Sequence, residues 1–190
     1  MTSVPASEKT ELWGRLDGET SVCLRRASPF EITTLHGLIA REIGGKVASL
    51  PVMVRASEIN RDSFWTIIRR RDADGRDEIA GCYAFLFLNA LGAQAIEART
   101  FDATDPAPEY LVASGERPAL VYMWAIVARK MLGVTFPMIS QGFDSGPYGG
   151  LPVVGRAGSM GGLKALSADA DAMDPPAIGT LFKLRNKAAA

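Results

Sequence analysis

Apolar residues recur at helical spacing in some segments and form short, strand-like runs in others, which predicts a mixed α/β fold. The clearest helix begins at Ser28, where Pro29 and Glu31 complete a helix-start pattern. Behind it, four apolar residues fall on one helical face: Leu35, Leu38, Ile39 and Ile43. Gly44–Gly45 ends the helix. A loop containing Pro51 is predicted to precede a short helical stretch around residues 57–60. An apolar helix over residues 129–139 and a helix opening at Ser159 are also predicted.

Runs rich in aromatic and β-branched residues predict the strands. Residues 64–69 and 78–88 flank a polar turn with Gly75, a pattern typical of an antiparallel hairpin. The second run is apolar on both faces and is therefore expected at the centre of the sheet. Further strands are predicted at residues 21–26, 93–101, 119–128, 151–156 and 178–184. The polar, proline-rich segment 102–118 is interpreted as a loop.

The composition indicates one folded domain. The chain has 190 residues, 47% of them hydrophobic and 22% charged. We expect a flexible N-terminal arm over residues 1–18 and a single domain over residues 19–187. Acidic and basic residues balance at 21 each, and the run Arg69–Arg71 is followed directly by acidic residues, which argues against a nucleic-acid surface.

Neither a secretory h-region nor a membrane-spanning apolar segment is present in the sequence. The two cysteines, Cys23 and Cys82, lie in apolar strand-like runs, where a thiol behaves as a small hydrophobe. We therefore expect a cytoplasmic protein without a membrane partner, and the sequence leaves a homodimer open. The single histidine, His36, has no cysteine or carboxylate at metal-ligand spacing, and no metal site is predicted.

Two glycine-containing segments follow strands in the second half of the chain. The first is Lys130-Met-Leu-Gly133-Val134-Thr135, and the second runs from Leu151 through Ser159 and Gly162 to Leu166. With the order of the elements, they resemble the GNAT superfamily of acyl-CoA-dependent N-acyltransferases. The resemblance implies a mixed, mostly antiparallel central sheet flanked by helices.

In that family, a loop after the fourth strand, of pattern Gln/Arg-x-x-Gly-x-Gly/Ala, binds the CoA pyrophosphate with its amides at a helix N-terminus. The pantetheine arm lies where the fourth and fifth strands splay apart. The resemblance implies that acetyl-CoA or another acyl-CoA is the co-substrate. The implied cofactor-binding residues are Trp124, Ile126, Val127, Lys130, Gly133, Val134, Thr135, Ser159 and Gly162. This chain has Lys130 where Gln or Arg is usual and Thr135 where Gly or Ala is usual.

An N-acyltransferase needs a base for the attacking amine and usually an acid for the leaving thiolate. Glu97 and Glu116 are the candidate bases, although each also suits an ordinary exposed position. The family's acid is usually a tyrosine near the fourth helix. This chain has no tyrosine after Tyr148, which is the candidate acid although its glycine neighbours also suit a turn.

Three functional hypotheses follow. The first is an enzyme that transfers an acetyl or other acyl group from acyl-CoA to a small-molecule or peptide amine. The second is a catalytically inactive GNAT-like module for CoA sensing or protein interaction, favoured by the altered loop and the missing late tyrosine. The third is an unrelated α/β domain in which the glycines only form turns. Binding of CoA separates the first two from the third, and turnover separates the first from the second.

Overall fold

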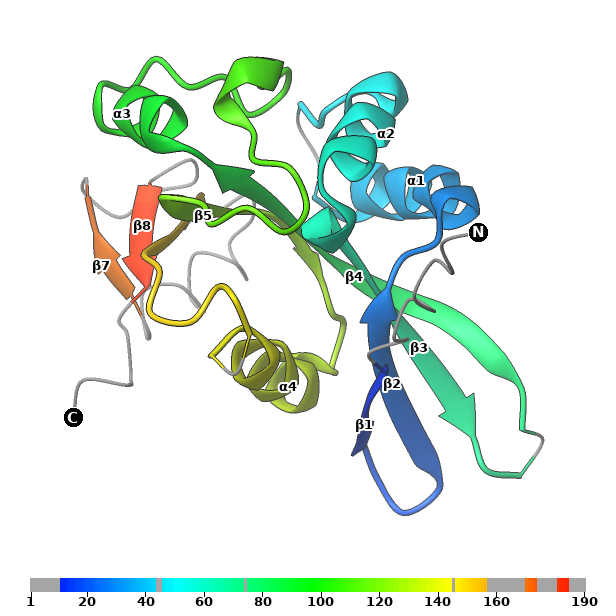
Figure 1. Cartoon of the computed structure of the whole chain (residues 1–190). Coiled ribbons are helices and arrows are strands. Elements are labelled where there is room, and N and C mark those ends of the chain that lie inside the picture. The colour runs from blue at the N-terminus through cyan, green and yellow to red at the C-terminus, as the bar shows by residue number, and fades with distance from the viewer. Residues whose placement is uncertain are drawn as a thin grey trace, which may run out of the picture.

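The computed structural model describes residues 11–43, 46–73, 75–144, 146–156, 170–173 and 181–184. Within these residues, eight strands form one sheet and four α-helices flank it (Figure 1). The strands are β1 (Glu11–Arg15), β2 (Thr20–Arg26), β3 (Phe64–Arg71), β4 (Asp77–Leu88), β5 (Leu120–Val127), β6 (Val153–Arg156), β7 (Ala170–Ala172) and β8 (Leu181–Leu184). The α-helices are α1 (Ile32–Ile43), α2 (Leu50–Ile59), α3 (Ala90–Glu97) and α4 (Leu132–Asp144). Short 3-10 turns lie at Pro29–Glu31, Arg61–Ser63 and Pro108–Tyr110.

The sheet is mixed and mostly antiparallel, as predicted. Its strand order is β1-β2-β3-β4-β5-β6-β8-β7. Every neighbouring pair is antiparallel except β5 and β6, which run parallel. Helix α4 and the turn after it connect these two parallel strands, because parallel neighbours require a crossover. The 64–69 and 78–88 hairpin is confirmed as β3 and β4, and β4 is central and buried.

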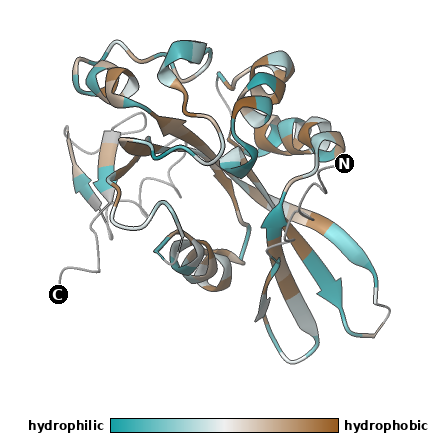
Figure 2. Cartoon of the chain, in the orientation of Figure 1, coloured by the Kyte–Doolittle hydropathy of each residue, from teal (hydrophilic) through white to brown (hydrophobic). Residues whose placement is uncertain are grey.

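Two apolar layers cover the sheet, one on each face. Helices α1, α2 and α3 lie over one face and α4 over the other (Figure 1). Alternate residues of β4 divide between the layers: Cys82, Ala84 and Leu86 face α1 and α2, whereas Tyr83 and Phe85 face α4. Figure 2 shows the hydrophobic colour concentrated on the strands between the helices. The apolar residues on both faces of β4 are therefore explained by a sheet that is covered on both sides.

The start of the first helix agrees with its sequence pattern. Ser28 and Glu31 form a reciprocal capping box, in which the Ser28 backbone amide donates to Glu31 Oε2 at 2.8 Å. Glu31 also pairs with Arg25 of β2 at 2.7 Å. The hydrogen bonds from Arg25 and Ser28 keep the pKa of Glu31 below its ordinary value despite the opposing effect of burial. The cap thus connects the end of β2 to α1.

Three predictions were wrong in detail. Residues 90–97 form helix α3 rather than a strand, because Asn89 caps it by accepting from the Gly92 amide at 3.0 Å and small residues fill its first turn. Pro51 lies in the first turn of α2 rather than in a loop. Residues 11–15, expected in a flexible arm, form β1 and pair with β2 along their whole length.

Both cysteines are buried and unpaired. Burial raises the pKa of the Cys82 thiol to about 12 and that of Cys23 to about 11. At pH 8 both thiols should stay protonated and shielded, so we expect a disulfide-exchange reagent to label neither cysteine in the native protein and both in 6 M guanidinium, measured by absorbance. Fast labelling of the native protein would contradict this packing. In the unfolded chain the thiols ionise at lower pH than in the folded protein. The folded state therefore loses stability relative to the unfolded state as pH rises above about 9.

Candidate functional site

Strand β5 changes its pairing at Trp124. On the β4 side, Ala84 pairs with Ala125 and Phe85 pairs with Met123, so Trp124 is the extra residue of a β-bulge. On the β6 side, the parallel ladder covers only Val121 to Met123. Gly155, the partner of Met123, is followed in β6 by one more described residue, Arg156, so the ladder ends where the description of this strand ends. The bulge at Trp124 thus lies directly after the described β5 and β6 ladder.

Beyond the bulge, β5 leads into the first turn of α4. Lys130 has a left-handed backbone with φ of 54°, a conformation uncommon outside glycine. The amides of Val134 and Thr135 bond to the Met131 carbonyl, whereas those of Leu132 and Gly133 have no partner among the described residues. A side chain at Gly133 would meet open space. The start of α4 thus presents unpaired donors and the positive end of the helix dipole to an open surface.

Two cations lie beside these donors. Arg129 pairs with Glu42 at the end of α1 at 2.7 Å, and Lys130 is exposed. Hydrogen bonds from Arg41 and Arg129 lower the pKa of Glu42 below its ordinary value. The Arg129 and Glu42 ion pair connects the turn after β5 to the end of α1 at the protein surface. The start of α4 therefore suits an anionic ligand.

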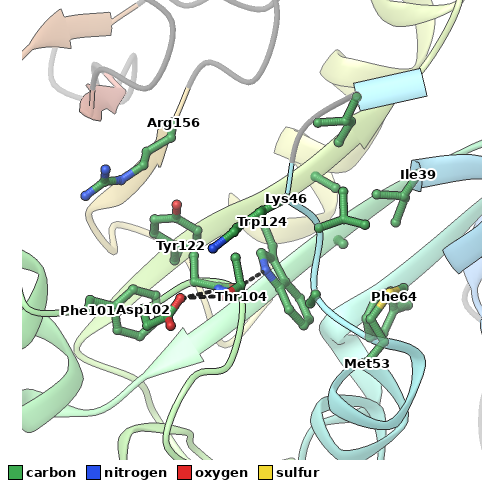
Figure 3. A pocket seen from close by; sticks show the side chains of 16 residues that line it. Ile39, Lys46, Met53, Phe64, Phe101, Asp102, Thr104, Tyr122, Trp124 and Arg156 are labelled. Atoms are coloured by element: carbon green, nitrogen blue, oxygen red, sulfur yellow. Dashed lines mark hydrogen bonds between the residues drawn. The ribbon is translucent and has the colours of Figure 1, made fainter. Parts of the chain in front are cut away.

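A cavity of about 320 Å³ adjoins the bulge on the α1 and α2 face of the sheet (Figure 3). Tyr122, Trp124 and Ala125 of β5 line it together with Arg156 of β6, so the cavity touches both strands. Its apolar wall comes mainly from helices and the central strands: Ile39, Ile43, Met53, Phe64, Ala84 and Phe101. The volume is in the range of small-molecule sites.

Four ionisable residues line the cavity, and they come from four separate parts of the chain: Lys46, Asp102, Tyr122 and Arg156. Burial raises the pKa of Tyr122, and the positive charge of Arg156 opposes this effect. Asp102 accepts from the Thr104 hydroxyl at 2.7 Å and from the Thr104 amide at 2.8 Å. These bonds, with a smaller effect of Lys46, lower the pKa of Asp102. At neutral pH the site therefore holds an ionised carboxylate and a protonated phenol.

The loop that carries Asp102 is anchored on both sides. The Trp124 indole Nε1 donates to the Ala103 carbonyl at 2.7 Å, and Arg55 of α2 pairs with Asp105 at 2.6 Å. The Trp124 ring also packs against Phe64, with ring centroids 5.8 Å apart. Trp124 was predicted to contact the cofactor, and its side chain is a wall of the cavity. Trp124 thus connects the bulge, the loop that carries Asp102 and the wall of the cavity.

The predicted bases do not line this cavity. Glu97 is exposed at the end of α3, and Glu116 is exposed in the loop before β5. The strand expected to aim Glu97 into a cleft is a helix, which explains its different position. Asp102 is instead the carboxylate among the cavity residues. The sequence signal for it was the acidic loop 102–118, which pattern alone could not connect to the sheet.

Tyr148, the predicted acid, lies in a buried network on the α4 face. Its hydroxyl donates to Asp62 Oδ2 at 2.6 Å, and Asp62 Oδ1 accepts from Arg26. Its ring stacks on Phe87 at 4.3 Å, and Phe143 packs edge-on against it. Burial and the Asp62 carboxylate raise its pKa. Tyr148 therefore joins the turn after α4 to the start of β3, outside the lining of the cavity.

The remaining predicted cofactor residues divide into two groups. Gly133 and Lys130 are exposed at the open start of α4, as described above. The other described residues are packed: Thr135 accepts from the Tyr83 hydroxyl at 2.8 Å, Val134 approaches Gly14 of β1, and Val127 is buried while Ile126 is half-buried. Thr135 thus anchors α4 on β4. Ser159 and Gly162, with the helix predicted at Ser159, lie outside the described residues.

Comparisons of the chain with models of known protein families, with curated proteins and with solved structures found no match. No cluster of three or more potential metal ligands occurs in the described part of the chain. None of its described helices has the length and apolar character needed to span a bilayer. The bulge at Trp124, the start of α4 and the cavity are the features of the described structure that bear on function.

Proposed function

We propose that this protein is an acyl-CoA-dependent N-acyltransferase with a GNAT-like arrangement of its sheet. The observation that carries the proposal is the bulge at Trp124. At this point the β5 and β6 ladder ends, the cavity opens, and the same strand continues to the unpaired amides of α4. β-Bulges are over-represented next to active sites, where they redirect a side chain or end the pairing of a strand.

The acyl-CoA would follow β5. Its pyrophosphate would accept hydrogen bonds from the amides of Leu132 and Gly133, beside the positive charge of Lys130. The pantetheine arm would lie along β5 beyond Met123, where the described ladder with β6 ends. From Trp124 to Lys130 an extended chain spans roughly 20 Å, a length that suits a pantetheine arm. The thioester would then reach the cavity.

Acyl transfer needs a neutral amine at the thioester carbon. Asp102 would accept a proton from the incoming ammonium and pass it to solvent, and the nitrogen would attack the carbonyl carbon. The C–N bond forms, the C–S bond breaks, and a second nitrogen-bound proton neutralises the thiolate. The Tyr122 hydroxyl, kept protonated by burial, would hydrogen-bond the reacting thioester.

Gly133→Glu is expected to weaken acetyl-CoA binding by on the order of 100-fold, because a carboxylate at this position repels the pyrophosphate. The position faces open space, and an acidic residue in the first turn favours the helix, so the fold should survive. Titration calorimetry with acetyl-CoA measures the effect. The control is Gly37→Glu, another exposed helical glycine in open space, on α1.

Micromolar binding by the native protein and by Gly37→Glu, but not by Gly133→Glu, supports the cofactor site. If the native protein bound no acyl-CoA, the proposal would fail. One observation favours the inactive module. Thr135 stands where the family has its second small residue, and its side chain is packed and hydrogen-bonded to Tyr83 and the Met131 carbonyl. Release of CoA from acetyl-CoA in the presence of amines decides between the enzyme and that module.

A further inference from the structure

Strand β1 lies at one end of the sheet. The strand order begins with β1, and none of the described strands pairs with its outer side (Figure 1). Its residues pair with β2 without a shift in register, so no bulge turns this edge away. The strand also contains neither proline nor lysine, two residues that commonly protect an edge. An edge of this kind can extend the sheet by accepting another strand.

The hydrogen-bonding groups of β1 alternate between the two sides of the strand. The Leu16 amide, directly after the strand, donates to the Thr20 carbonyl of β2 at 2.9 Å. Because hydrogen-bonded and non-hydrogen-bonded pairs alternate along an antiparallel ladder, the second and fourth residues of β1 also bond to β2. The first, third and fifth residues therefore direct their amides and carbonyls outward. These residues are Glu11, Trp13 and Arg15.

This outward pattern is self-complementary about Trp13. When a second copy of β1 pairs antiparallel with Trp13 opposite its own counterpart, Glu11 of each copy lies opposite Arg15 of the other. All three outward-facing positions then form hydrogen-bonded pairs, which exchange both backbone hydrogen bonds. The register overlaps the whole of both strands, and opposite charges that face each other across strands are stabilising. The charges and the hydrogen-bonding groups of the edge thus favour the same two-fold partner.

The side chains of the edge suit this partner. Trp13 is 45% exposed, and the Arg70 guanidinium lies over its ring, 4.7 Å from the centroid. Tryptophan and arginine are enriched in protein interfaces, and opposed aromatic rings on one face cover part of each other's surface. Arg15 pairs with Asp72 at 2.8 Å, but its side chain is 57% exposed, so a second carboxylate can approach it from solvent. Glu11 is exposed as well.

We propose that two copies of this chain form a symmetric dimer by antiparallel pairing of their β1 edges, with Trp13 at the two-fold axis. The two sheets then join into one continuous sheet. The strand contact is smaller than a standard interface, which buries about 800 Å² per partner, so a Kd on the order of 10 µM is expected. Dimerisation requires no acyl-CoA, and its failure would leave the proposed function untouched.

Sedimentation velocity of the native protein between about 1 and 100 µM measures the dimer through the rise of its sedimentation coefficient with concentration. Glu11→Lys places a lysine opposite Arg15 of the partner subunit, and each dimer contains this pair twice. We therefore expect the Kd to rise at least about 10-fold. The matched control is Glu58→Lys, the same charge change at an exposed position of α2, which should leave the Kd unchanged.

A mixing experiment tests the register. Arg15→Glu alone places two carboxylates opposite each other and should also weaken the dimer. An equimolar mixture of Glu11→Lys and Arg15→Glu restores opposite charges at both ends, so we expect the mixture to recover the dimer. Far-UV circular dichroism shows whether each variant folds. Glu11→Lys and its control decide by themselves where Arg15→Glu does not fold, since Arg15 also pairs with Asp72.

Three outcomes overturn the proposal. The first is a native protein that stays monomeric at about 100 µM. The second is a dimer that Glu11→Lys does not weaken, because its interface then lies elsewhere. The third is a mixture of two folded variants that stays monomeric, because the two strands then do not pair with Glu11 opposite Arg15 of the partner subunit.

Discussion

Replacing Gly81 with valine is expected to leave no cooperatively folded protein. A Cβ built at this position would lie 2.1 Å from the carbonyl oxygen of Val127, and 3.0 Å from a methyl group of Ile67. The closest obstacle is backbone, which cannot move aside as a side chain can. We expect a destabilisation above about 4 kcal/mol, a value reached only by severe core defects. Loss of the thermal transition in circular dichroism measures it.

The control separates this clash from the general cost of changing a glycine. Gly18→Val lies in a turn with open space around its Cα and should shift Tm by only a few degrees. A Gly81→Val protein with a native-like transition would show that the Val127 carbonyl does not lie against Gly81 as described. The position matters for the site, because Val127 ends β5 directly before the turn to α4.

Asp62→Ala is expected to lower the free energy of unfolding by about 2–4 kcal/mol, because it leaves the Tyr148 hydroxyl and the Arg26 guanidinium without their shared partner. The Asp62 side chain is 11% exposed, whereas that of Arg26 is 41% exposed, so water replaces part of the loss only at Arg26. Urea denaturation at neutral pH measures the change. An effect below about 0.5 kcal/mol, the usual range of surface substitutions, would contradict the buried network.

Tyr148→Phe complements this experiment. It removes one hydrogen bond but keeps the ring stacked on Phe87, so a loss of about 1 kcal/mol is expected. Acyl-CoA binding and kcat should stay unchanged well below Tm. A large loss of kcat in a stable Tyr148→Phe protein would instead restore Tyr148 as the acid.

Local patterns were sufficient for the elements whose evidence is local. The Ser28 and Glu31 capping box, the β3 and β4 hairpin and the central position of β4 follow from hydrogen-bonding groups and hydrophobic spacing within a few residues. The neutralisation of the basic run by nearby acidic residues could also be predicted from the sequence. In the structure, Arg69 pairs with Glu78 and Arg70 with Asp77 across the hairpin. In each case the interacting partners are close in sequence or joined by one turn.

The segment at residues 90–97 shows where local evidence failed. Its small apolar residues suit a helix or a strand, and the Asn89 cap with packing over the sheet decided for the helix. That decision moved Glu97 to the surface. Short apolar runs are ambiguous in this way because their periodicity is too brief to separate the two structures.

The sequence by itself determined the mixed fold, the buried central hairpin and the glycine-bearing turn into α4, because these depend on short-range spacing and backbone conformation. The tertiary structure alone decided the candidate site. Lys46, Asp102, Tyr122 and Arg156 meet only because β5 lies between β4 and β6, and because the loop at Asp102 docks on Trp124. The bulge at Trp124 also has no sequence signature, since it arises from the register between two strands and not from either strand alone.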